Sequence, residues 1–515
     1  MAVNNPILQS DFPDVDVIRV DDTYYMISTT MHFMPGAVIL RSFDLVHWEI
    51  FTHVFETLDD TPAQRMEGGQ SIYGQGMWAA SLRHHGGTFY VCFVANDTRK
   101  TYLYQAQDIR GPWRRQIVEG FYHDCSLLFD DDGHTYIVYG NTEIFITELR
   151  GDLSGPQEGG LHRVIIRDQP GVALGYEGAH IYKIDGRYYV FLIHWLADGT
   201  RRRTQACFAA DALGGEFSGG DILDDDMGYH NMGVAQGGVV DTPDGDWYAV
   251  LFQDQGAVGR VPVLVPMRWE NRFPVLGVGG RVPAYVETKS TRPNHIYAPF
   301  VSSDDFRYQP NDDGTITLSS VWQWNHAPDN ALWSVDGARG ALTITTARLS
   351  ENVTRAANVL TQRAIWPGCS ASVQVDASAL REGDYAGLCA LQGRYGMVAI
   401  TKENGQLFAV MQGRPGEADY TMGQTCDTEA GVEHGRVALG EREATLMARL
   451  HFRDMEDYAE FFYLQGGEWR QIGAAQGLYF GLDHFVGCRF GLFIYATQES
   501  GGSASFREFV YAREG

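Results

Sequence analysis

A short turn followed by a residue pair that ends in tyrosine recurs five times in the first half of this chain. The five copies are residues 21–25, 86–90, 132–136, 185–189 and 244–248. Each copy leads into a short run of β-branched and aromatic residues, and a turn ahead of such a run is typical of a β-hairpin. Hairpins that recur roughly every 45 to 65 residues predict radial blades of about four strands each. Five such blades form a closed ring, whose axial end gathers one loop from every blade into a single pocket.

The second half of the chain has a different pattern. Residues 286–305 lose the hydrophobic alternation and predict a linker. From residue 306 onward, short strand-like runs alternate with polar turns, which is typical of a β-sandwich. No helical period is sustained for long in either half. The sequence therefore predicts an all-β protein, with the ring of blades at residues 1–285, the linker at 286–305 and the sandwich at 306–515.

The charge and the cysteines limit what the protein can bind and where it acts. A formal net charge of −25 disfavours nucleic acid and anionic membranes as partners, since both need basic patches, and it favours a neutral ligand. Nothing approaches a transmembrane run, and the N-terminal residues lack the basic start and apolar stretch of a secretion signal. The seven cysteines are scattered without ligand spacing, as expected for buried reduced thiols. We expect a cytoplasmic protein of bacterial origin.

Three acidic residues occupy equivalent positions at the starts of three different blades. Asp14 lies just before the first predicted strand, Asp124 lies one strand ahead of the third recurrent turn, and Glu177 lies just ahead of the fourth. At these positions the innermost strand of a blade leaves the central axis, so the three side chains can meet in the axial pocket. Asp16 alternates with Asp14 along the same strand and is a weaker candidate for the axis.

A pocket with several carboxylates suits the hydrolysis of a glycosidic bond with inversion. One carboxylate activates a water molecule, and a protonated carboxylic acid donates its proton to the leaving oxygen, with space for the water between them. The acid needs a raised pKa, which a third carboxylate can supply through like-charge repulsion. The acidic run at residues 130–132 is interpreted as a solvated turn, because it lacks the wider ligand pattern of a calcium loop.

Several of these segments resemble elements of glycoside hydrolase family 43. In the first half, the matching elements are residues 5–8 (Asn-Pro-Ile-Leu), 12–14 (Phe-Pro-Asp), 24–25 (Tyr-Tyr), 44–48 (Asp-Leu-Val-His-Trp), 124–128 (Asp-Cys-Ser-Leu-Leu) and 177–180 (Glu-Gly-Ala-His). In the second half, residues 303–306, 322–326 and 360–363 resemble the concanavalin-like sandwich appended to many xylosidases of this family. The resemblance spans nearly the whole chain in the correct order. It implies a five-bladed β-propeller followed by a concanavalin-like β-sandwich.

The resemblance also assigns roles to the three carboxylates. It implies an inverting, exo-acting glycoside hydrolase in which Asp14 is the general base and Glu177 is the general acid. Asp124 is the residue that tunes the pKa of the acid and orients it. These roles agree with the reasoning from the residues alone, which could not say which carboxylate does what.

The residues expected to bind the substrate are Phe33, Trp78, His123, Gln236 and Arg260. By resemblance, Trp78 forms part of the pocket wall and Phe33 flanks the sugar. Arg260 is similar to an arginine that hydrogen-bonds the bound sugar and faces the carboxylates in family members. Such a cation would also help keep the general base ionised.

The sequence departs from the family pattern at three positions. Val15 and Cys125 replace the prolines that follow the base and the tuning aspartate, and both changes are conservative for the mechanism. Gln236 stands where many members carry a histidine on the propeller axis, which in some relatives binds calcium or orients the tuning aspartate. The amide oxygen of Gln236 can ligate calcium weakly or hydrogen-bond water. We expect that the chemistry requires no cofactor, and a single axial calcium ion stays an open alternative.

The predicted activity is the release of terminal β-D-xylose, α-L-arabinofuranose or both from xylo- or arabinoxylo-oligosaccharides. The sandwich favours the xylosidase, since in relatives it lends a loop to the pocket rim and shortens the site. One alternative is an endo-arabinanase of the same family, which needs an open cleft. Another is a non-catalytic glycan-binding propeller, whose mark would be the loss of a carboxylate. A retaining propeller that acts on sucrose or fructans lacks its usual motifs here, and a homo-oligomer stays open.

Overall fold

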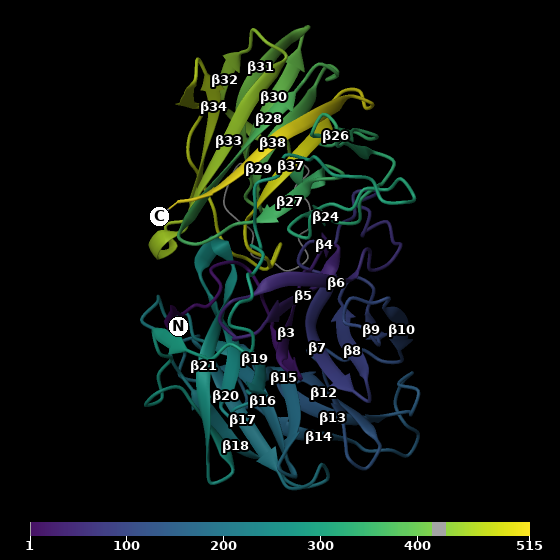
Figure 1. Ribbon diagram of the computed structural model, residues 1–515, viewed down its shortest axis with the longest axis vertical. Helices are drawn as coiled ribbons and strands as arrows, with labels where there is room; N and C mark the ends of the chain where they lie inside the picture. The colour runs from purple at the N-terminus through teal and green to yellow at the C-terminus, as the bar shows by residue number, and fades with distance from the viewer. Residues whose placement is uncertain (1, 415–428, 515) are drawn as a thin grey trace.

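The computed structural model describes residues 2–414 and 429–514, which form two lobes built almost entirely of β-strands (Figure 1). The N-terminal half forms the lower lobe in Figure 1, and most of the C-terminal half forms the upper lobe. Three 3₁₀ turns of three residues each are the helical segments among the described residues. Within the same part of the chain, no helix is long and apolar enough to cross a bilayer.

The lower lobe is a ring of five blades, each a four-stranded antiparallel sheet that is continuous in sequence. Blade 1 contains β2 (Asp16–Val20), β3 (Thr23–Ser28), β5 (Gly36–Ser42) and β6 (Glu49–Phe55); blade 2 contains β7 (Met77–His85), β8 (Thr88–Ala95), β9 (Lys100–Ala106) and β10 (Arg114–Val118); blade 3 contains β11 (Ser126–Phe129), β12 (Thr135–Asn141), β13 (Glu143–Leu149) and β14 (His162–Arg167); blade 4 contains β15 (Glu177–Ile184), β16 (Arg187–Trp195), β17 (Arg203–Ala210) and β18 (Ser218–Leu223); blade 5 contains β19 (Ala235–Asp241), β20 (Trp247–Asp254), β21 (Arg260–Glu270) and β22 (Phe273–Leu276). Every recurrent turn of the sequence joins the first and second strands of its blade. The predicted five-bladed propeller is confirmed.

The residues at these turns suit the backbone that a tight hairpin needs. Asp21 and Asp185 have φ values of 54° and 49°, and Gly133 and Gly245 have φ values of 84° and 88°. Short hairpin connections need this left-handed backbone, which aspartate and glycine adopt more readily than most residues. The apolar side chains of facing sheets form one buried cluster at each of the five interfaces between neighbouring blades. The hydrophobic core therefore lies between the blades, and the axis is left for polar groups.

The two ends of the propeller segment meet at the rim of the ring. Strand β1 (Ala2–Asn4) pairs with β23 (Tyr285–Glu287), which follows the last blade. The side-chain amide of Asn5 donates hydrogen bonds to the carbonyl oxygens of Leu264 and Pro283 at 2.8 and 2.9 Å. Because no blade borrows a strand from the other end of the chain, these contacts fasten the first blade to the last.

The upper lobe is a sandwich of two antiparallel sheets around one apolar core. In order across the first sheet lie β32 (Val432–Ala438), β31 (Gln406–Gly413), β30 (Gly396–Glu403), β29 (Asp384–Leu391), β37 (Arg489–Ala496), β27 (Leu360–Arg363), β24 (Gln323–Asn325) and β4 (Phe33–Met34). The second sheet contains β25 (Trp333–Asp336), β26 (Ala341–Thr345), β38 (Ser503–Arg513), β28 (Gly368–Asp376), β33 (Glu443–His451), β34 (Tyr458–Gln465) and β35 (Glu468–Gln471), and β36 (Gln476–Gly477) pairs with β34. The many short strands of the second half thus form the sandwich that the sequence predicted.

The two lobes share a sheet. Strand β4 comes from the loop between β3 and β5 of blade 1, and it pairs with β24 at the edge of the sandwich sheet. Between β23 and β24 the chain contains no strand beyond an isolated bridge from Asp304 to Phe509. We keep residues 286–305 as the proposed linker, whose first residues still belong to β23. The shared sheet holds the sandwich directly against a loop of the propeller.

Candidate active site

The backbone is distorted where the innermost strands begin. Asp14 lies two residues before β2, and Asp124 lies two residues before β11. Their φ values are 52° and 48°. Glu177 is the first residue of β15, and the register of that strand shifts between Glu177 and His180. Left-handed backbone at a non-glycine residue costs free energy and is often found at functional sites, as are β-bulges. The three sequence-predicted carboxylates therefore share an unusual local setting at the same end of the propeller.

Asp14 forms a buried ion pair with Arg260. The Arg260 Nη1 group donates to Asp14 Oδ1 at 2.7 Å, and both side chains are almost completely buried. The main-chain N–H of Arg260 donates to Asp11 at 2.8 Å, which fixes the start of β21. Burial raises the pKa of Asp14, the positive charge of Arg260 opposes that shift, and the charge of Asp124 adds to it. The structure thus places Arg260 against the carboxylate of Asp14, and its contact with a bound sugar stays a prediction.

Asp124 and Glu177 lie together with His123. The main-chain N–H of Gly178 donates to Asp124 Oδ2 at 3.1 Å. The Nε2 atom of His123 lies 3.8 Å from Asp124 Oδ2 and 3.6 Å from Glu177 Oε2. Burial works to lower the pKa of His123, but the two carboxylates outweigh it and raise the pKa to about 9. The raised pKa favours the protonated form of His123, which lies close to both Asp124 and Glu177.

The pKa of Asp124 is raised, and its neighbours act on it in opposite directions. Burial is the main cause of the raised pKa, His123 opposes it, and the nearby charge of Glu177 adds to it. Glu177 itself accepts a hydrogen bond from the side-chain amide of Asn141, at the end of β12. The two carboxylates therefore form an interacting pair on neighbouring blades. In such a pair the charge of one group can shift the pKa of the other.

Aromatic side chains from both lobes surround these charges. Trp78, near the start of β7, lies 5.6 Å from the ring of His123 and 5.6 Å from the ring of Phe485. Phe485 belongs to the segment at residues 478–488 of the sandwich, and its ring lies 4.3 Å from the guanidinium of Arg260. Its carbonyl oxygen accepts a hydrogen bond from Arg260 Nη2 at 3.2 Å. A second aromatic of the segment, Phe480, packs 6.0 Å from Phe485. The sandwich thus contributes side chains to the site.

Sequence reasoning did not find three residues of this site. Asn141 carries no local signal, since it ends an ordinary strand. Phe480 and Phe485 lie in an aromatic-rich loop of the sandwich, and only the packing of the two lobes brings them to Arg260. One sequence signal could have indicated Phe480 and Phe485. Both lie in a short segment that lacks the alternation of a strand.

Two predicted substrate-binding residues lie in more enclosed positions. Gln236, with φ of 57°, is buried and packs so closely on Gly178 that a Cβ atom there would lie 2.7 Å from its Cδ. Phe33 is 1% exposed, and the guanidinium of Arg489 lies 3.5 Å from the centre of its ring. Gln236 therefore lies beside the acid, whereas Phe33 lies at the junction of the lobes. Contact of either with a sugar stays a prediction.

The donor atoms of His123, Asp124 and Glu177 lie within 4.8 Å of one another, which makes them a candidate metal group. The group does not fit calcium, however. Calcium prefers six to eight oxygen ligands, and this group offers two carboxylates and one imidazole nitrogen. Gln236 is not a member of the group. No step of the chemistry below depends on a metal ion.

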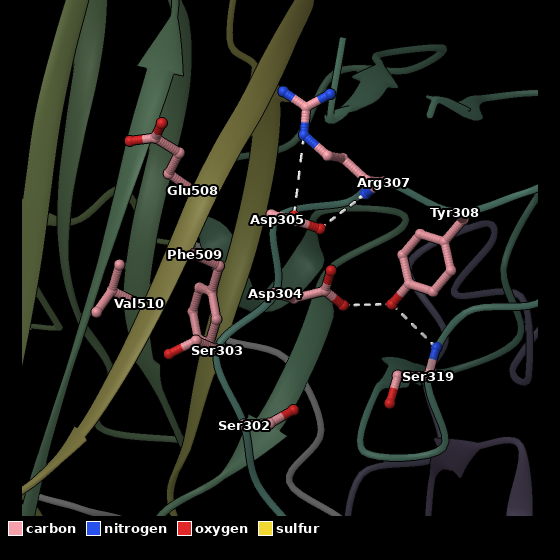
Figure 2. A pocket seen from close by; sticks show the side chains of 10 residues that line it. All are labelled: Ser302, Ser303, Asp304, Asp305, Arg307, Tyr308, Ser319, Glu508, Phe509 and Val510. Carbon is pink, nitrogen blue, oxygen red and sulfur yellow. Dashed lines mark hydrogen bonds and ion pairs between the residues drawn. The ribbon is translucent and has the colours of Figure 1, made fainter. Parts of the chain in front are cut away.

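A hollow of about 600 Å³ lies elsewhere, on the sandwich, between residues 302–308 and β38 (Figure 2). None of the predicted site residues lines it. Its polar groups serve the local fold, since Tyr308 donates to Asp304 and accepts a hydrogen bond from the main-chain N–H of Ser319 at 3.0 Å. The carboxylates of the propeller, and not this hollow, form the candidate active site.

Two family models and several known proteins match this chain. The sequence model of the family described as "Glycosyl hydrolases family 43" matches residues 3–274, and that of the "Beta xylosidase C-terminal Concanavalin A-like domain" matches residues 314–512. The chain is 26% identical to a "Beta-xylosidase" from Formosa agariphila, over 99% of this chain and 90% of that protein. It is also 26% identical to "Xylosidase/arabinosidase 43B" from Humicola insolens, over 92% of this chain and 88% of that one.

Two solved structures have the same fold over nearly all of this chain. A chain described as "Bifunctional GH43-CE" from Bacteroides eggerthii is 41% identical, with a TM-score of 0.90 over 99% of this chain. This chain spans 64% of the length of that protein. An engineered GH43 enzyme described as having endo-xylanase and exo-arabinofuranosidase activity is 26% identical, with a TM-score of 0.87 over the whole of both chains.

Proposed function

Because this chain belongs to glycoside hydrolase family 43, we propose that it is an exo-acting hydrolase that releases terminal β-D-xylose, α-L-arabinofuranose or both from xylo- and arabinoxylo-oligosaccharides. The proposal is supported by the ion pair of Asp14 with Arg260 and by the grouping of Asp124 and Glu177 around His123. The names of the relatives, which include xylosidases and arabinofuranosidases, support both sugars.

In the proposed mechanism, Asp14 accepts a proton from the attacking water while Glu177 protonates the leaving oxygen. Arg260 favours the ionised form of Asp14 against the effect of burial and keeps its carboxylate oriented. Asp124 and the protonated His123 set the charge around Glu177 and hold it toward the pocket. The water attacks on the face opposite the leaving group, so the anomeric configuration inverts. The reaction requires no cofactor.

The segment at residues 478–488 supports exo action. It packs Phe485 against Arg260 and Trp78, so one side of the pocket is covered by the sandwich. An endo-acting enzyme needs a cleft open at both sides, which this covering disfavours. The endo-arabinanase alternative is accordingly the second choice.

A cytoplasmic location stays part of the proposal. The six cysteines described by the structure are free and buried, which agrees with a reducing compartment. Short imported oligosaccharides would then be the substrates.

The test is a comparison of initial rates on 4-nitrophenyl β-D-xylopyranoside and 4-nitrophenyl α-L-arabinofuranoside, with and without a chelator. We expect turnover of at least one substrate and no effect of the chelator. NMR of the first-formed product should show the inverted anomer. Absence of turnover on both substrates, or a retained anomer, would contradict the proposal.

Substitution of the base separates an enzyme from a sugar-binding protein. Asp14→Asn should abolish turnover and leave binding of xylose, measured by calorimetry, largely intact. If D14N kept near-normal rates, the assignment of the base would be wrong. A wild-type protein that bound xylose but never turned over any glycoside would favour the non-catalytic alternative.

A further inference from the structure

A single arginine fills the propeller axis next to the catalytic carboxylates. Arg83 extends from β7, and its guanidinium reaches three other innermost strands, β2, β11 and β15. Asp14 and Asp124 lie two residues before β2 and β11, and Glu177 is the first residue of β15. The side chain is 11% exposed, and the ring of Tyr182 lies 5.0 Å from the guanidinium.

Arg83 uses all its hydrogen-bonding capacity in this position. A guanidinium has five N–H donors, and each has an acceptor within 3.3 Å. The acceptors are Asp16 Oδ2 at 2.6 Å, Ser126 Oγ at 2.7 Å, and the carbonyl oxygens of Leu82 at 2.7 Å, Leu127 at 2.9 Å and Ile181 at 3.3 Å.

The spacing of these acceptors relates them directly to the catalytic groups. Asp16 lies two residues after Asp14, and Ser126 lies two residues after Asp124. Asp14 and Asp124 lie outside the strands on left-handed backbone, whereas Asp16 and Ser126 are the first residues of β2 and β11 and bind Arg83. On β15, the bulge after Glu177 displaces the register, and there Arg83 binds the main chain at Ile181.

Asp16 is the anionic partner at the centre of this arrangement. It is fully buried, and it accepts hydrogen bonds from the main-chain N–H groups of Val17 and Leu82 at 3.0 and 2.8 Å. Burial works to raise its pKa, but Arg83 and His180 outweigh burial and hold the pKa at about 2. Asp16 and Arg83 therefore form a charged pair at neutral pH.

We propose that Arg83 is a positioning residue, which sets the spacing of the general base, the general acid and the tuning aspartate by tying their strands together on the axis. Arginine suits this role because its planar fork reaches several acceptors in fixed directions, whereas a lysine ammonium offers a single point charge. An inverting reaction depends on that spacing, because a water molecule must fit between base and substrate while the acid reaches the leaving oxygen.

A second hollow of about 340 Å³ gives access to Arg83 from the opposite end of the axis. Arg83 lines it, together with residues from the later parts of all five innermost strands, at 17–19, 84–85, 127–129, 181–184 and 239–241. Removal of the Arg83 side chain would extend this hollow to Asp16. A free guanidinium ion could then enter and take the place of the missing group without passing through the substrate pocket.

The experiment compares Arg83→Ala with the wild type on an aryl glycoside, with and without guanidinium chloride at tens of millimolar. Misplacement of catalytic groups by an ångström costs on the order of 100-fold in rate, so we expect R83A to lose about that factor in kcat. KM should change little, because the residues expected to contact the sugar make no hydrogen bond with Arg83. Guanidinium should restore a large part of kcat in R83A, and sodium chloride at equal concentration should not.

Arg19→Ala is the matched control. Arg19 lines the same hollow and joins β2 to Asp241 of β19 at 2.6 Å, but it binds near none of the strand starts. Its kcat should match the wild type and should not respond to guanidinium. A folded R83A whose kcat stayed within about threefold of the wild type, or whose loss resisted guanidinium, would overturn the inference.

Two further measurements keep the test decisive. If R83A does not fold, Ser126→Ala is the substitute, because it removes one acceptor of Arg83 and leaves the Arg83–Asp16 ion pair. A wild-type kcat in S126A would then overturn the positioning role of Arg83. The inference rests on the proposed function. Thermal unfolding distinguishes a failure of the inference from a failure of the proposed function. A wild type without glycosidase activity would overturn the proposed function, whereas guanidinium should still raise the melting temperature of R83A, and not of R19A, if the tie is real.

Discussion

At the scale of single residues, the environment of Asp14 combines two opposing influences. Burial raises its pKa, and the guanidinium of Arg260 at 2.7 Å lowers it, with Arg203 acting in the same direction. The net pKa lies above the usual value for aspartate. Since a general base works only when ionised, the acidic limb of the rate profile should report this group.

Replacing Arg260 should therefore move that limb. In Arg260→Ala the opposing charge is lost, so the pKa of Asp14 rises further and the acidic limb of kcat/KM shifts to higher pH. Measured pH–rate profiles of wild type and variant test this. Arg268→Ala, which removes an exposed arginine paired with Glu270, should leave the limb in place. A limb that stayed unchanged in R260A would remove Asp14 as its source.

Glu177 has a separate residue-scale signature in the leaving group. An aryl leaving group needs little protonation, whereas a sugar alkoxide needs it fully, so Glu177→Ala should lose more activity on xylobiose than on the aryl xyloside. General acid catalysis contributes about 100- to 10,000-fold, which sets the expected loss on xylobiose. Glu143→Ala, an exposed glutamate on β13, is the control. Equal losses of E177A on both substrates would count against Glu177 as the acid.

At the scale of elements, the segment at residues 478–488 connects the sandwich to the pocket. The ring of Phe485 packs against the guanidinium of Arg260. The carbonyl oxygen of Phe485 accepts a hydrogen bond from Arg260. The main-chain hydrogen bond survives substitution of the side chain, whereas the aromatic wall does not. We therefore expect the segment to affect sugar binding through the Phe485 ring and to position Arg260 through its backbone.

Phe485→Ala should weaken binding more than chemistry. Loss of one aromatic wall of the pocket removes roughly 1 to 2 kcal/mol of contact, which corresponds to a rise in KM of about tenfold. The kcat should fall much less, since Arg260 keeps its hydrogen bonds to Asp14 and to the main chain. Steady-state kinetics on the aryl xyloside give the result. Trp469→Ala, which removes an exposed aromatic on β35, should change neither constant.

At the scale of the whole molecule, three buried histidines meet where the lobes join. His32 comes from the propeller, and His326 and His484 come from the sandwich half, with ring centres 5.2 and 5.7 Å from that of His32. The main-chain N–H of Ile72 donates to His326 Nε2 at 3.0 Å, which requires that nitrogen to be unprotonated. Burial lowers the pKa of all three, to about 4 for His484. The junction is therefore built around neutral imidazoles.

Acid should weaken this junction. Below about pH 6.5 the unfolded chain binds protons at these histidines and the folded protein does not, so stability falls as the pH decreases toward 4. Each histidine contributes roughly 1.4 kcal/mol per pH unit to this slope. Above about pH 6.5 both states are neutral at these sites, and their contribution is constant. Urea unfolding at a series of pH values measures the slope.

A single substitution isolates one member of the cluster. His484→Gln should flatten the acidic slope by about the contribution of one histidine, whatever its effect on stability at neutral pH. His230→Gln, which removes an exposed histidine of the propeller, should leave the slope unchanged. An identical slope in the wild type and H484Q would show that His484 binds a proton equally in the folded and unfolded states.

The sequence by itself determined the elements, because their signals are local. An aspartate or glycine turn before a β-branched run specifies a hairpin wherever it occurs, and five copies at even spacing specify five blades. The positions of Asp14, Asp124 and Glu177 at blade starts followed from that repeat, and the family resemblance named their roles. The prediction that Asp16 could also face the axis had the same origin, since alternation along a strand needs no tertiary information.

Tertiary structure alone decided which of these residues contact one another. Phe485 lies 225 residues beyond Arg260 in the sequence, and Arg83 lies 67 residues beyond Asp16, so no local pattern relates either pair. Closure of the ring brings five innermost strands together, and Arg83 contacts three of them besides its own. The shared sheet at β4 and β24 then fixes the sandwich against the propeller. Contacts of this kind depend on how complete sheets pack, and packing is a property of the folded chain as a whole.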